Sequence, residues 1–291
     1  FDRAAAAYDV IAGTGASLGV VLTYPDRPTE RPTANARTVA RRAPHPDSPA
    51  PATGPRAPAV AVLGAGNFAV RTLLPALREA GVRLHTIASG SGTNAAIEAE
   101  KFGFENVTND LDVVFASPDI DAVFVLTRHD THADLALRAL RAGKHAFVEK
   151  PLALTEADVD ALAVAAEESG RMLMVGFNRR FAPLTRELGR ALATRAGPLA
   201  TVVTVNAGAL PADHWTHDAA QGGGRIVGEA CHFIDLVRAL TASPITSLTA
   251  TAAHTRDGRP VDDVAQLALS FADGSVAAIH YLSSGSSSFP K

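Results

Sequence analysis

Short apolar runs alternate with helical patterns from residue 59 to about residue 175. The predicted strands are residues 59–63, 84–88, 122–126, 145–148 and 172–175, and the predicted helices are residues 68–80, 95–102, 133–142 and 156–168. Strands that are apolar on both faces and alternate with helices are typical of a parallel sheet covered by helices on both sides. The pattern therefore predicts a doubly wound α/β domain over residues 59–180.

The pattern changes near residue 197 to longer strands in which apolar and polar residues alternate. These strands are predicted at residues 200–207, 245–253, 265–271 and 275–281, and one helix at residues 229–240 interrupts them. Such strands, joined by turns such as Asp273-Gly274, favour an antiparallel sheet. We therefore expect a second, α+β domain over residues 181–291 with a largely antiparallel sheet. We expect it to be C-terminally truncated, because the sequence stops soon after the last predicted strand.

Residues 26–58 are rich in proline. Nine of the 18 prolines lie between Pro25 and Pro58, with almost no large apolar side chain among them. Such a segment buries too little apolar area to offset the entropy of ordering it, so we predict an extended linker. An irregular loop laid on a domain is the alternative.

The first 25 residues combine a helical pattern with an apolar strand and are too short to form a core of their own. The segments from Ala7 to Gly13 and from Leu18 to Leu22 resemble the last helix and strand of medium-chain alcohol dehydrogenases. This resemblance implies that residues 1–25 are the tail of another domain. We therefore expect the chain to be a fragment of a longer protein.

Composition argues against several classes of protein. Apolar residues make up 47% of the chain and charged residues 20%, as in ordinary globular proteins. The formal net charge of −3 offers no basic surface for a nucleic acid, and no apolar run reaches the roughly 18 residues of a membrane span. Cys231 is the only cysteine, which excludes an internal disulfide. Because the start also lacks a signal-peptide pattern, we expect a soluble, cytoplasmic protein that binds neither nucleic acid nor membrane.

A glycine-rich turn joins the first strand of the α/β domain to its first helix. In Gly64-Ala65-Gly66-Asn67-Phe68, Gly64 permits a tight turn and Gly66 lets the backbone approach a pyrophosphate at the helix N-terminus. Because a strand precedes it and a helix follows, the turn predicts a Rossmann-like dinucleotide site. The next strand ends at Ser89, where an acid would select NAD, so the serine leaves NAD and NADP both open.

Three further motifs carry a family resemblance. They are Thr127-Arg128-His129 leading to His132, Glu149-Lys150-Pro151 after the next strand, and the glycine-rich residues 222–228 leading to Glu229, His232 and Asp235. Together they resemble the Gfo/Idh/MocA oxidoreductases over residues 59–291. With the dehydrogenase-like tail in front, the whole chain resembles a fragment of a bi-domain oxidoreductase, in which an alcohol dehydrogenase is fused to a Gfo/Idh/MocA unit.

The resemblance implies an NAD(P)-dependent oxidoreductase acting on a secondary hydroxyl of a sugar, sugar derivative or cyclitol. Lys150 follows the C-terminal end of a predicted strand, where open α/β sheets bind ligands, and its ammonium can polarise a substrate oxygen. His232 suits a general base or acid because imidazole titrates near neutral pH. In the family an acid lies one helical turn before this histidine. Here that position is Gly228, so we expect Glu229, or alternatively Asp235, to orient His232.

The candidate site residues form three groups. The catalytic candidates are Lys150, His232 and Glu229. The cofactor-binding candidates are Gly64, Gly66, Asn67, Phe68, Ser89, Thr127, Arg128, His129, His132, Glu149, Lys150 and Asn178. The substrate-binding candidates are Lys150, Arg179, Trp215, His217, Asp235 and His232. The pairs His129/His132 and His214/His217 have no convincing third ligand, so we expect no metal.

Two other functions remain open. The displaced acid would suit a dinucleotide-binding regulatory or partner module that has lost turnover. Some relatives instead keep NAD bound and recycle it through oxidation, elimination and reduction. In each case we expect a small polyol or sugar ligand. We also expect a homo-oligomer formed through the C-terminal sheet, because an uncovered sheet invites association.

Overall fold

The structure is a computed structural model that describes residues 38–40, 56–90, 92–254, 260–286 and 288–289. All of these residues lie in one compact unit, which begins at Thr38. The predicted tail, residues 1–25, lies outside the described residues, as does most of the predicted linker, residues 26–58.

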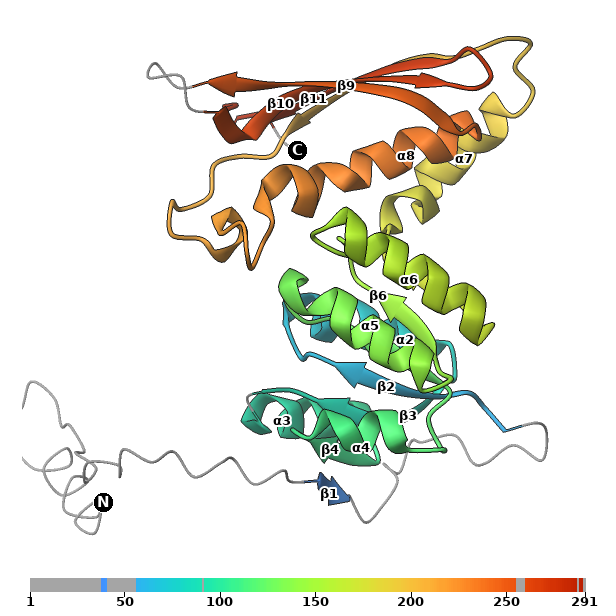
Figure 1. The fold of residues 1–291 in the computed structure, drawn as a ribbon, viewed down its shortest axis with the longest axis vertical. Coiled ribbons are helices and arrows are strands. Elements are labelled where there is room, and N and C mark those ends of the chain that lie inside the picture. The colour runs from blue at the N-terminus through green and yellow to red at the C-terminus, as the bar shows by residue number, and fades with distance from the viewer. Residues whose placement is uncertain (1–37, 41–55, 91, 255–259, 287, 290–291) are drawn as a thin grey trace, which may run out of the picture. The chain divides into compact units, whose positions relative to one another are not determined.

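The described residues of the first domain form a doubly wound sheet (Figure 1). Its strands are β1(Thr38–Ala40), β2(Ala59–Leu63), β3(Arg83–Ala88), β4(Asn106–Thr108), β5(Ala122–Val125), β6(His145–Val148) and β7(Leu173–Val175). Their order is β1-β4-β3-β2-β5-β6-β7, and the neighbours from β4 to β7 are parallel. This order reverses direction at β2, as in dinucleotide-binding folds. The predicted Rossmann-like fold is confirmed.

Helices cover both faces of this sheet because its central strand is apolar throughout. They are α2(Leu74–Glu79), α3(Gly92–Phe102), α4(Leu111–Ala116), α5(His132–Arg141) and α6(Glu156–Ser169). Every residue of β2 is buried. Alternate residues of β2 point to opposite faces, so Leu63 joins a core with α5, while Val62 joins a core with α2.

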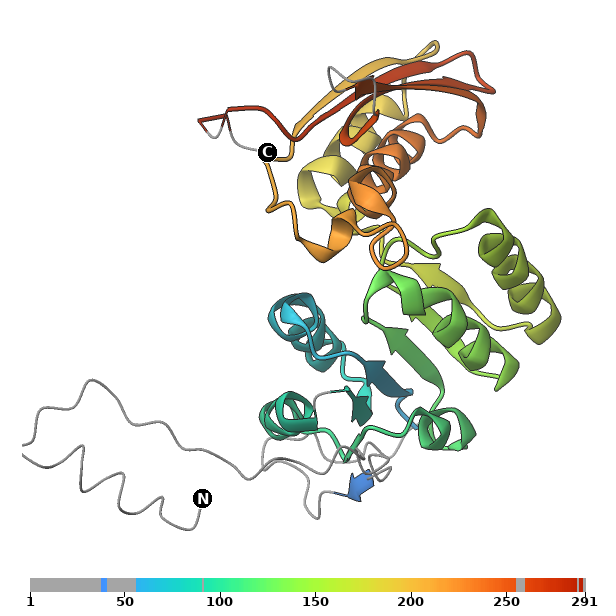
Figure 2. The ribbon, with the colours of Figure 1, turned by 60° about the vertical axis from the view of Figure 1, so that its left-hand side comes forward.

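The second domain is a four-stranded sheet with one face covered by a helix (Figure 2). Its strands are β8(Ala200–Asn206), β9(Ile245–His254), β10(Pro260–Phe271) and β11(Val276–Leu282), in the order β8-β11-β10-β9. Only the β8–β11 pairing is parallel, so the predicted antiparallel character is confirmed. The helix α8(Cys231–Thr241) packs Phe233 and Val237 against Leu267 and Ile279.

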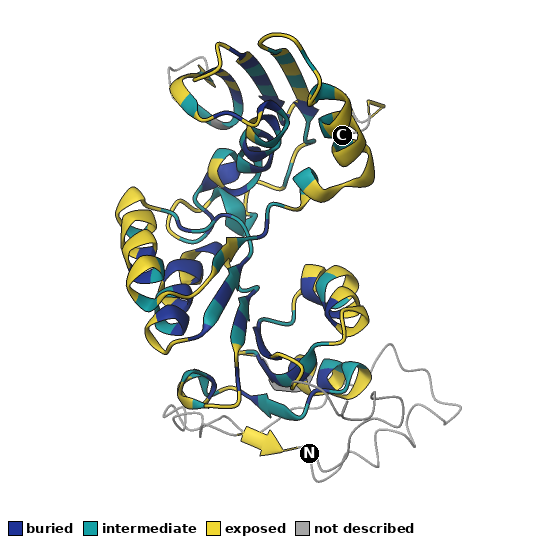
Figure 3. Cartoon of the chain, turned by 90° about the vertical axis from the view of Figure 1, so that its right-hand side faces the viewer, coloured by how far each residue is buried: buried dark blue, intermediate teal, exposed yellow. Residues whose placement is uncertain are grey.

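No described helix covers the other face of this sheet. Alternate residues of β10 and β11 are buried toward α8, and the residues between them are more exposed (Figure 3). Ala268, Ala278 and Val202 are cross-strand neighbours on the open face, and Val202 is 72% exposed.

The helix that carries His232 begins earlier than predicted. Residues 224–241 form one continuous helix, in which a π-helical turn, η5(Ile226–Ala230), precedes α8. The prediction relied on the 3.6-residue period of an α-helix, and a π-helical turn interrupts that period, so the start of the helix was placed too late.

Several short elements were not predicted. They are β1, β4, α4 and α7(Pro183–Leu192). The strand β1 lies within the predicted linker and pairs antiparallel with β4 at the edge of the sheet. The helix α7 has leucines at positions 184, 188 and 192, a spacing typical of one helix face, so the prediction overlooked this signal, although none of its residues is fully buried.

A charged pair connects the segment after β7 to α8. Nε of Arg180 donates to Oδ2 of Asp235 at 2.9 Å, and Nη2 donates to Oδ1 of the same carboxylate. The Asp235 side chain is only 7% exposed. Both oxygens of Asp235 accept from Arg180, which favours a structural role for this carboxylate, and the substrate contact that we predicted for it stays a prediction.

Replacement of Asp235 tests this role. Asp235→Asn leaves Arg180 without its charged partner, so we expect the free energy of unfolding to fall by about 3 kcal/mol, which a denaturant titration measures. The KM of any substrate should change little. An unchanged stability with a raised KM would restore the predicted substrate contact.

Candidate active site

The glycine turn after β2 has the geometry that a dinucleotide site requires. Gly64 has a φ of +102°, and a Cβ placed there would lie 2.5 Å from the carbonyl oxygen of Leu126. Its N–H donates to the carbonyl of Ala88 at 2.8 Å. Only glycine tolerates this combination of positive φ and close approach, so Gly64 holds the ends of β2, β3 and β5 together.

Gly66 serves a different purpose. A Cβ added at Gly66 would meet no atom within 4 Å, and Gly66, Asn67 and Phe68 are exposed where the helix of residues 67–79 begins. Open space at a helix N-terminus is suited to a phosphate group. The end of β3 presents Ser89, which is partly exposed. These residues fit a dinucleotide.

The end of β6 meets the helix of residues 224–241 at a pocket of about 300 Å³, which we name the inner pocket. It is lined by His129, Lys150, Arg179, Leu210, Trp215, Thr216, Gly224, Arg225, Gly228, Glu229 and His232. Nζ of Lys150 donates to the carbonyl oxygen of Gly228 at 2.7 Å. The structure thus brings six of the predicted residues into one cavity: Lys150, His232, Glu229, Arg179, Trp215 and His129.

The imidazole of His232 is neutral at physiological pH. Burial lowers its pKa to about 4, and the positive charges of Lys150 and Arg179 act in the same direction. Its Nδ1 is buried without a hydrogen-bond partner. The nitrogen that can exchange a proton with a ligand is therefore Nε2.

The ring of His129 fills the space that a side chain at position 228 would need. A Cβ on Gly228 would lie 2.8 Å from Cε1 of His129. Nδ1 of His129 donates to the carbonyl of Gly222 at 2.8 Å, since a carbonyl oxygen can only accept. Burial lowers the pKa of this ring to about 4, so it is neutral near pH 7. The rings of His129 and Trp215 contact each other edge to face, with 4.7 Å between their centroids.

Glu229 does not orient His232 in the way we predicted. Its Oε2 accepts hydrogen bonds from Nη2 of Arg225 at 2.8 Å and from the hydroxyl of Tyr281 at 2.5 Å. The carboxylate thus ties the π-helical turn to β11. Since Nδ1 of His232 has no partner, neither Glu229 nor Asp235 holds the ring through that nitrogen.

His132 lies behind the site and not in it. The ring is fully buried, with Nδ1 2.7 Å from the carbonyl of Pro151 and Nε2 3.2 Å from that of Thr127. Both nitrogens contact protein atoms, so His132 positions the ends of β5 and β6. We predicted a cofactor contact here, and the burial of the ring opposes it.

The remaining cofactor candidates lie around the end of the sheet. Oε2 of Glu149 accepts from the N–H of Lys150 at 3.2 Å, whereas Oε1 is buried without a partner, and burial raises the pKa of this carboxyl. The hydroxyl of Thr127 bonds to that of Thr131 at 2.6 Å. Asn178 is exposed at the start of the 3₁₀ turn after β7.

Arg179 is one of the substrate-binding candidates. Its guanidinium lies 4.4 Å from the ring centroid of Phe233.

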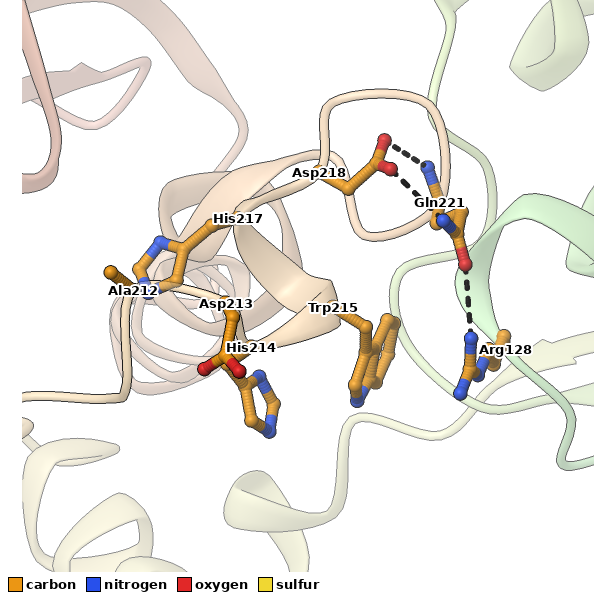
Figure 4. A pocket seen from close by; sticks show the side chains of 8 residues that line it. All are labelled: Arg128, Ala212, Asp213, His214, Trp215, His217, Asp218 and Gln221. Atoms are coloured by element: carbon orange, nitrogen blue, oxygen red, sulfur yellow. Dashed lines mark hydrogen bonds between the residues drawn. The ribbon is translucent and has the colours of Figure 1, made fainter.

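A second pocket of about 470 Å³, which we name the outer pocket, shares Trp215 with the inner one (Figure 4). It is lined by Arg128, Ala212, Asp213, His214, Trp215, His217, Asp218 and Gln221. Arg128 and His217, predicted for cofactor and substrate, therefore lie outside the inner pocket.

Sequence patterns missed several lining residues, notably Arg225 and Thr216. Arg225 lies four residues before Glu229, a spacing at which opposite charges pair on a helix, so this pair had a detectable signal. Thr216 carries no such signal. Among the described residues, no group of three or more His, Cys, Asp or Glu side chains could hold a metal ion. No described helix is long and apolar enough to cross a membrane.

Comparison with protein families matches both domains. The model described as "Oxidoreductase family, NAD-binding Rossmann fold" matches residues 59–177, and the "GFO/IDH/MocA C-terminal domain" model matches residues 191–286. The chain belongs to the Gfo/Idh/MocA family. Its first domain is the NAD-binding Rossmann domain of that family.

Individual Gfo/Idh/MocA proteins resemble the chain over much of its length. Inositol 2-dehydrogenase of Rhizobium meliloti is 35% identical over 66% of this chain and 57% of its own length, so this chain spans less than two thirds of that relative. A structure of levoglucosan dehydrogenase with NADH and levoglucosan has a TM-score of 0.70 at 26% identity, covering 80% of this chain and 68% of its own. A structure of GenD2 from gentamicin A biosynthesis, with NAD, has a TM-score of 0.67 at 26% identity, covering 77% and 65%.

The two glycines of the turn should fail in different ways when each is replaced by alanine. Gly64→Ala forces a side chain into the Leu126 carbonyl, so we expect a loss of about 2–3 kcal/mol in the free energy of unfolding. Gly66→Ala meets no atom, so we expect near-native stability but an NAD affinity lowered more than about tenfold, or 1.4 kcal/mol. Calorimetry and NAD titration of both variants measure this. Equal effects of the two changes would contradict it.

The neutral histidines should make stability depend on pH. His129 and His232 have folded-state pKa values of about 4, against about 6.5 in an unfolded chain. The unfolded state binds more protons between these values, so the free energy of unfolding falls as the pH is lowered from about 6.5 toward 4. We expect a lower Tm at pH 5 than at pH 7. His232→Gln should flatten this dependence, whereas His254→Gln, on an exposed strand position, should not.

Proposed function

We propose that the chain is an NAD(P)-dependent oxidoreductase that moves hydride between the nicotinamide and a secondary hydroxyl of a sugar, sugar derivative or cyclitol. The observation that carries this is the convergence of Lys150 and His232 in the inner pocket, at the end of β6. Ligands bind at this edge of open α/β sheets. The names of the inositol and levoglucosan dehydrogenases support the class of substrate.

Lys150 and His232 divide the proton chemistry. The nicotinamide, when bound, accepts the hydride from the carbinol carbon. The Lys150 ammonium, held by its bond to the Gly228 carbonyl, has two further N–H groups with which to polarise the substrate oxygen. Nε2 of His232 takes the hydroxyl proton and returns it in the reverse direction. In this proposal the substrate ring lies with Lys150 on one side and with Arg179 and Trp215, which line the same pocket, on the other.

The cofactor is NAD or NADP with little discrimination. Ser89 follows the end of β3, the position at which an acid would bind the ribose hydroxyls and repel a 2′-phosphate. Because serine does neither, we expect a preference below about tenfold.

A non-catalytic dinucleotide-binding module is the second candidate. The observation that favours it is the engagement of Glu229 with Arg225 and Tyr281, which leaves Nδ1 of His232 without a carboxylate. A reduced-nicotinamide absorbance assay with a panel of polyols and sugars separates the two. NAD(P)H binding without turnover of any compound would favour the module.

We also infer that the chain forms a homo-oligomer through the open face of the C-terminal sheet. Val202, Ala278 and Ala268 form an apolar row across three strands of that face, which a second copy can cover. Light scattering of the chain and of Ala268→Lys tests it.

We further propose a cytoplasmic location, and that residues 1–25 are the tail of a medium-chain dehydrogenase domain.

Removal of either polar group should lower turnover, and removal of His232 should leave cofactor binding intact. We expect Lys150→Ala and His232→Ala each to reduce kcat by roughly 10²–10⁴. His232→Ala should keep its NAD affinity because His232 lies on the C-terminal domain. A His232→Ala variant with intact kcat and a collapsed Tm would show that the imidazole is only structural.

A further inference from the structure

The outer pocket lies next to the inner pocket, and one side chain belongs to both. Trp215 lines the two cavities. Its indole ring is 5.5 Å from the guanidinium of Arg128, which lines the outer pocket, and 4.7 Å from the ring of His129, which lines the inner one. The two pockets therefore adjoin at Trp215, and a ligand long enough to occupy both would contact its indole ring.

Hydrogen bonds between two loops hold this wall in place. Nη1 of Arg128 donates to Oε1 of Gln221 at 2.9 Å, and the N–H of Asp130 donates to the carbonyl of Gln221 at 3.2 Å. His129 is bonded to the carbonyl of Gly222. The loop that carries Trp215 is thus fixed to the segment between β5 and α5, and the outer pocket is a formed cavity.

The outer pocket is not a part of the dinucleotide site. None of the residues of the glycine turn lines it, and neither does Ser89. Arg128 is the one lining residue that we predicted to contact the cofactor, and its guanidinium is turned to Gln221 and Trp215.

The charges of the outer pocket oppose an anionic ligand. Arg128 carries one positive charge, whereas Asp213 and Asp218 carry two negative charges. The carboxylate of Asp218 is used within the loop, where it accepts from the N–H of Ala220 at 2.8 Å and from Nε2 of Gln221 at 2.9 Å. An aromatic ring with polar neighbours and no excess positive charge suits an uncharged hydroxylated ring better than a diphosphate.

We propose that the outer pocket is a subsite for the second, uncharged sugar ring of a glycoside whose first ring is oxidised in the inner pocket. The proposal rests on the proposed oxidoreductase function and narrows its substrate to a compound of at least two rings. Its volume of about 470 Å³ lies within the range of small-molecule sites.

Trp215 provides a direct measure of binding because it is the only tryptophan in the sequence. The fluorescence of the protein without bound NADH can be followed while each of a fixed set of probes is added. The probes are glucose and galactose as single rings, cellobiose, lactose and trehalose as double rings, and UDP-glucose as an anionic extension. We expect at least one disaccharide to bind tenfold or more tightly than both monosaccharides and UDP-glucose. Equal affinities, or a preference for UDP-glucose, would overturn the proposal.

A variant that fills only the outer pocket completes the test. Ala212 is exposed and lines that pocket but not the inner one, and Ala219 is an exposed alanine of the same loop that lines neither. Ala212→Phe should remove the tenfold advantage of the disaccharide and leave monosaccharide binding within twofold. Ala219→Phe should change neither. Equal effects of the two variants would refute the subsite.

Turnover with the same probes separates this proposal from the proposed function. Oxidation of monosaccharides with no gain for any disaccharide would refute the subsite alone. Binding of disaccharides with no reduction of NAD or NADP would refute the oxidoreductase function and leave the outer pocket as a ligand site.

Discussion

The ammonium of Lys150 donates a hydrogen bond of 2.7 Å to the carbonyl of Gly228, and through it the end of β6 meets the π-helical turn before α8. Position 228 also has to be a glycine for the ring of His129 to lie where it does, because a Cβ there would be 2.8 Å from Cε1 of that ring. Gly228, Lys150 and His129 are therefore one unit. Its geometry sets the width of the inner pocket and the place of His232 within it.

Burial then determines the charges in this pocket. Two imidazoles, of His129 and His232, lie near a single ammonium, and desolvation keeps both rings neutral. A neutral imidazole next to an ammonium gives the pocket a proton acceptor and a proton donor at the same pH. The carboxylate of Glu229 also lines this pocket, where its Oε2 accepts hydrogen bonds from Arg225 and Tyr281.

Much of the fold was predictable, because its signals are local. The strand β2 is buried at every residue and lies where the apolar run predicted it, and β6 matches its predicted range. The glycine turn was also predictable, since Gly64 adopts a positive φ, a conformation that glycine tolerates and most other residues do not. Short elements such as β4 and α4 were missed because three to six residues contain too few periods to distinguish a strand or helix from a loop.

The sequence by itself determined the doubly wound sheet and the phosphate-binding turn, because both depend on residue types at short spacing. The pairing of Lys150 with His232, which lie far apart in the chain, was implied only by the resemblance to the Gfo/Idh/MocA family. Only the tertiary structure decided the long-range partners of the acids. Glu229 is three residues from His232 but pairs with Tyr281, and Asp235 pairs with Arg180, 55 residues earlier. A carboxylate binds the donors that folding brings nearest, and helical spacing places only neighbours on its own helix within reach.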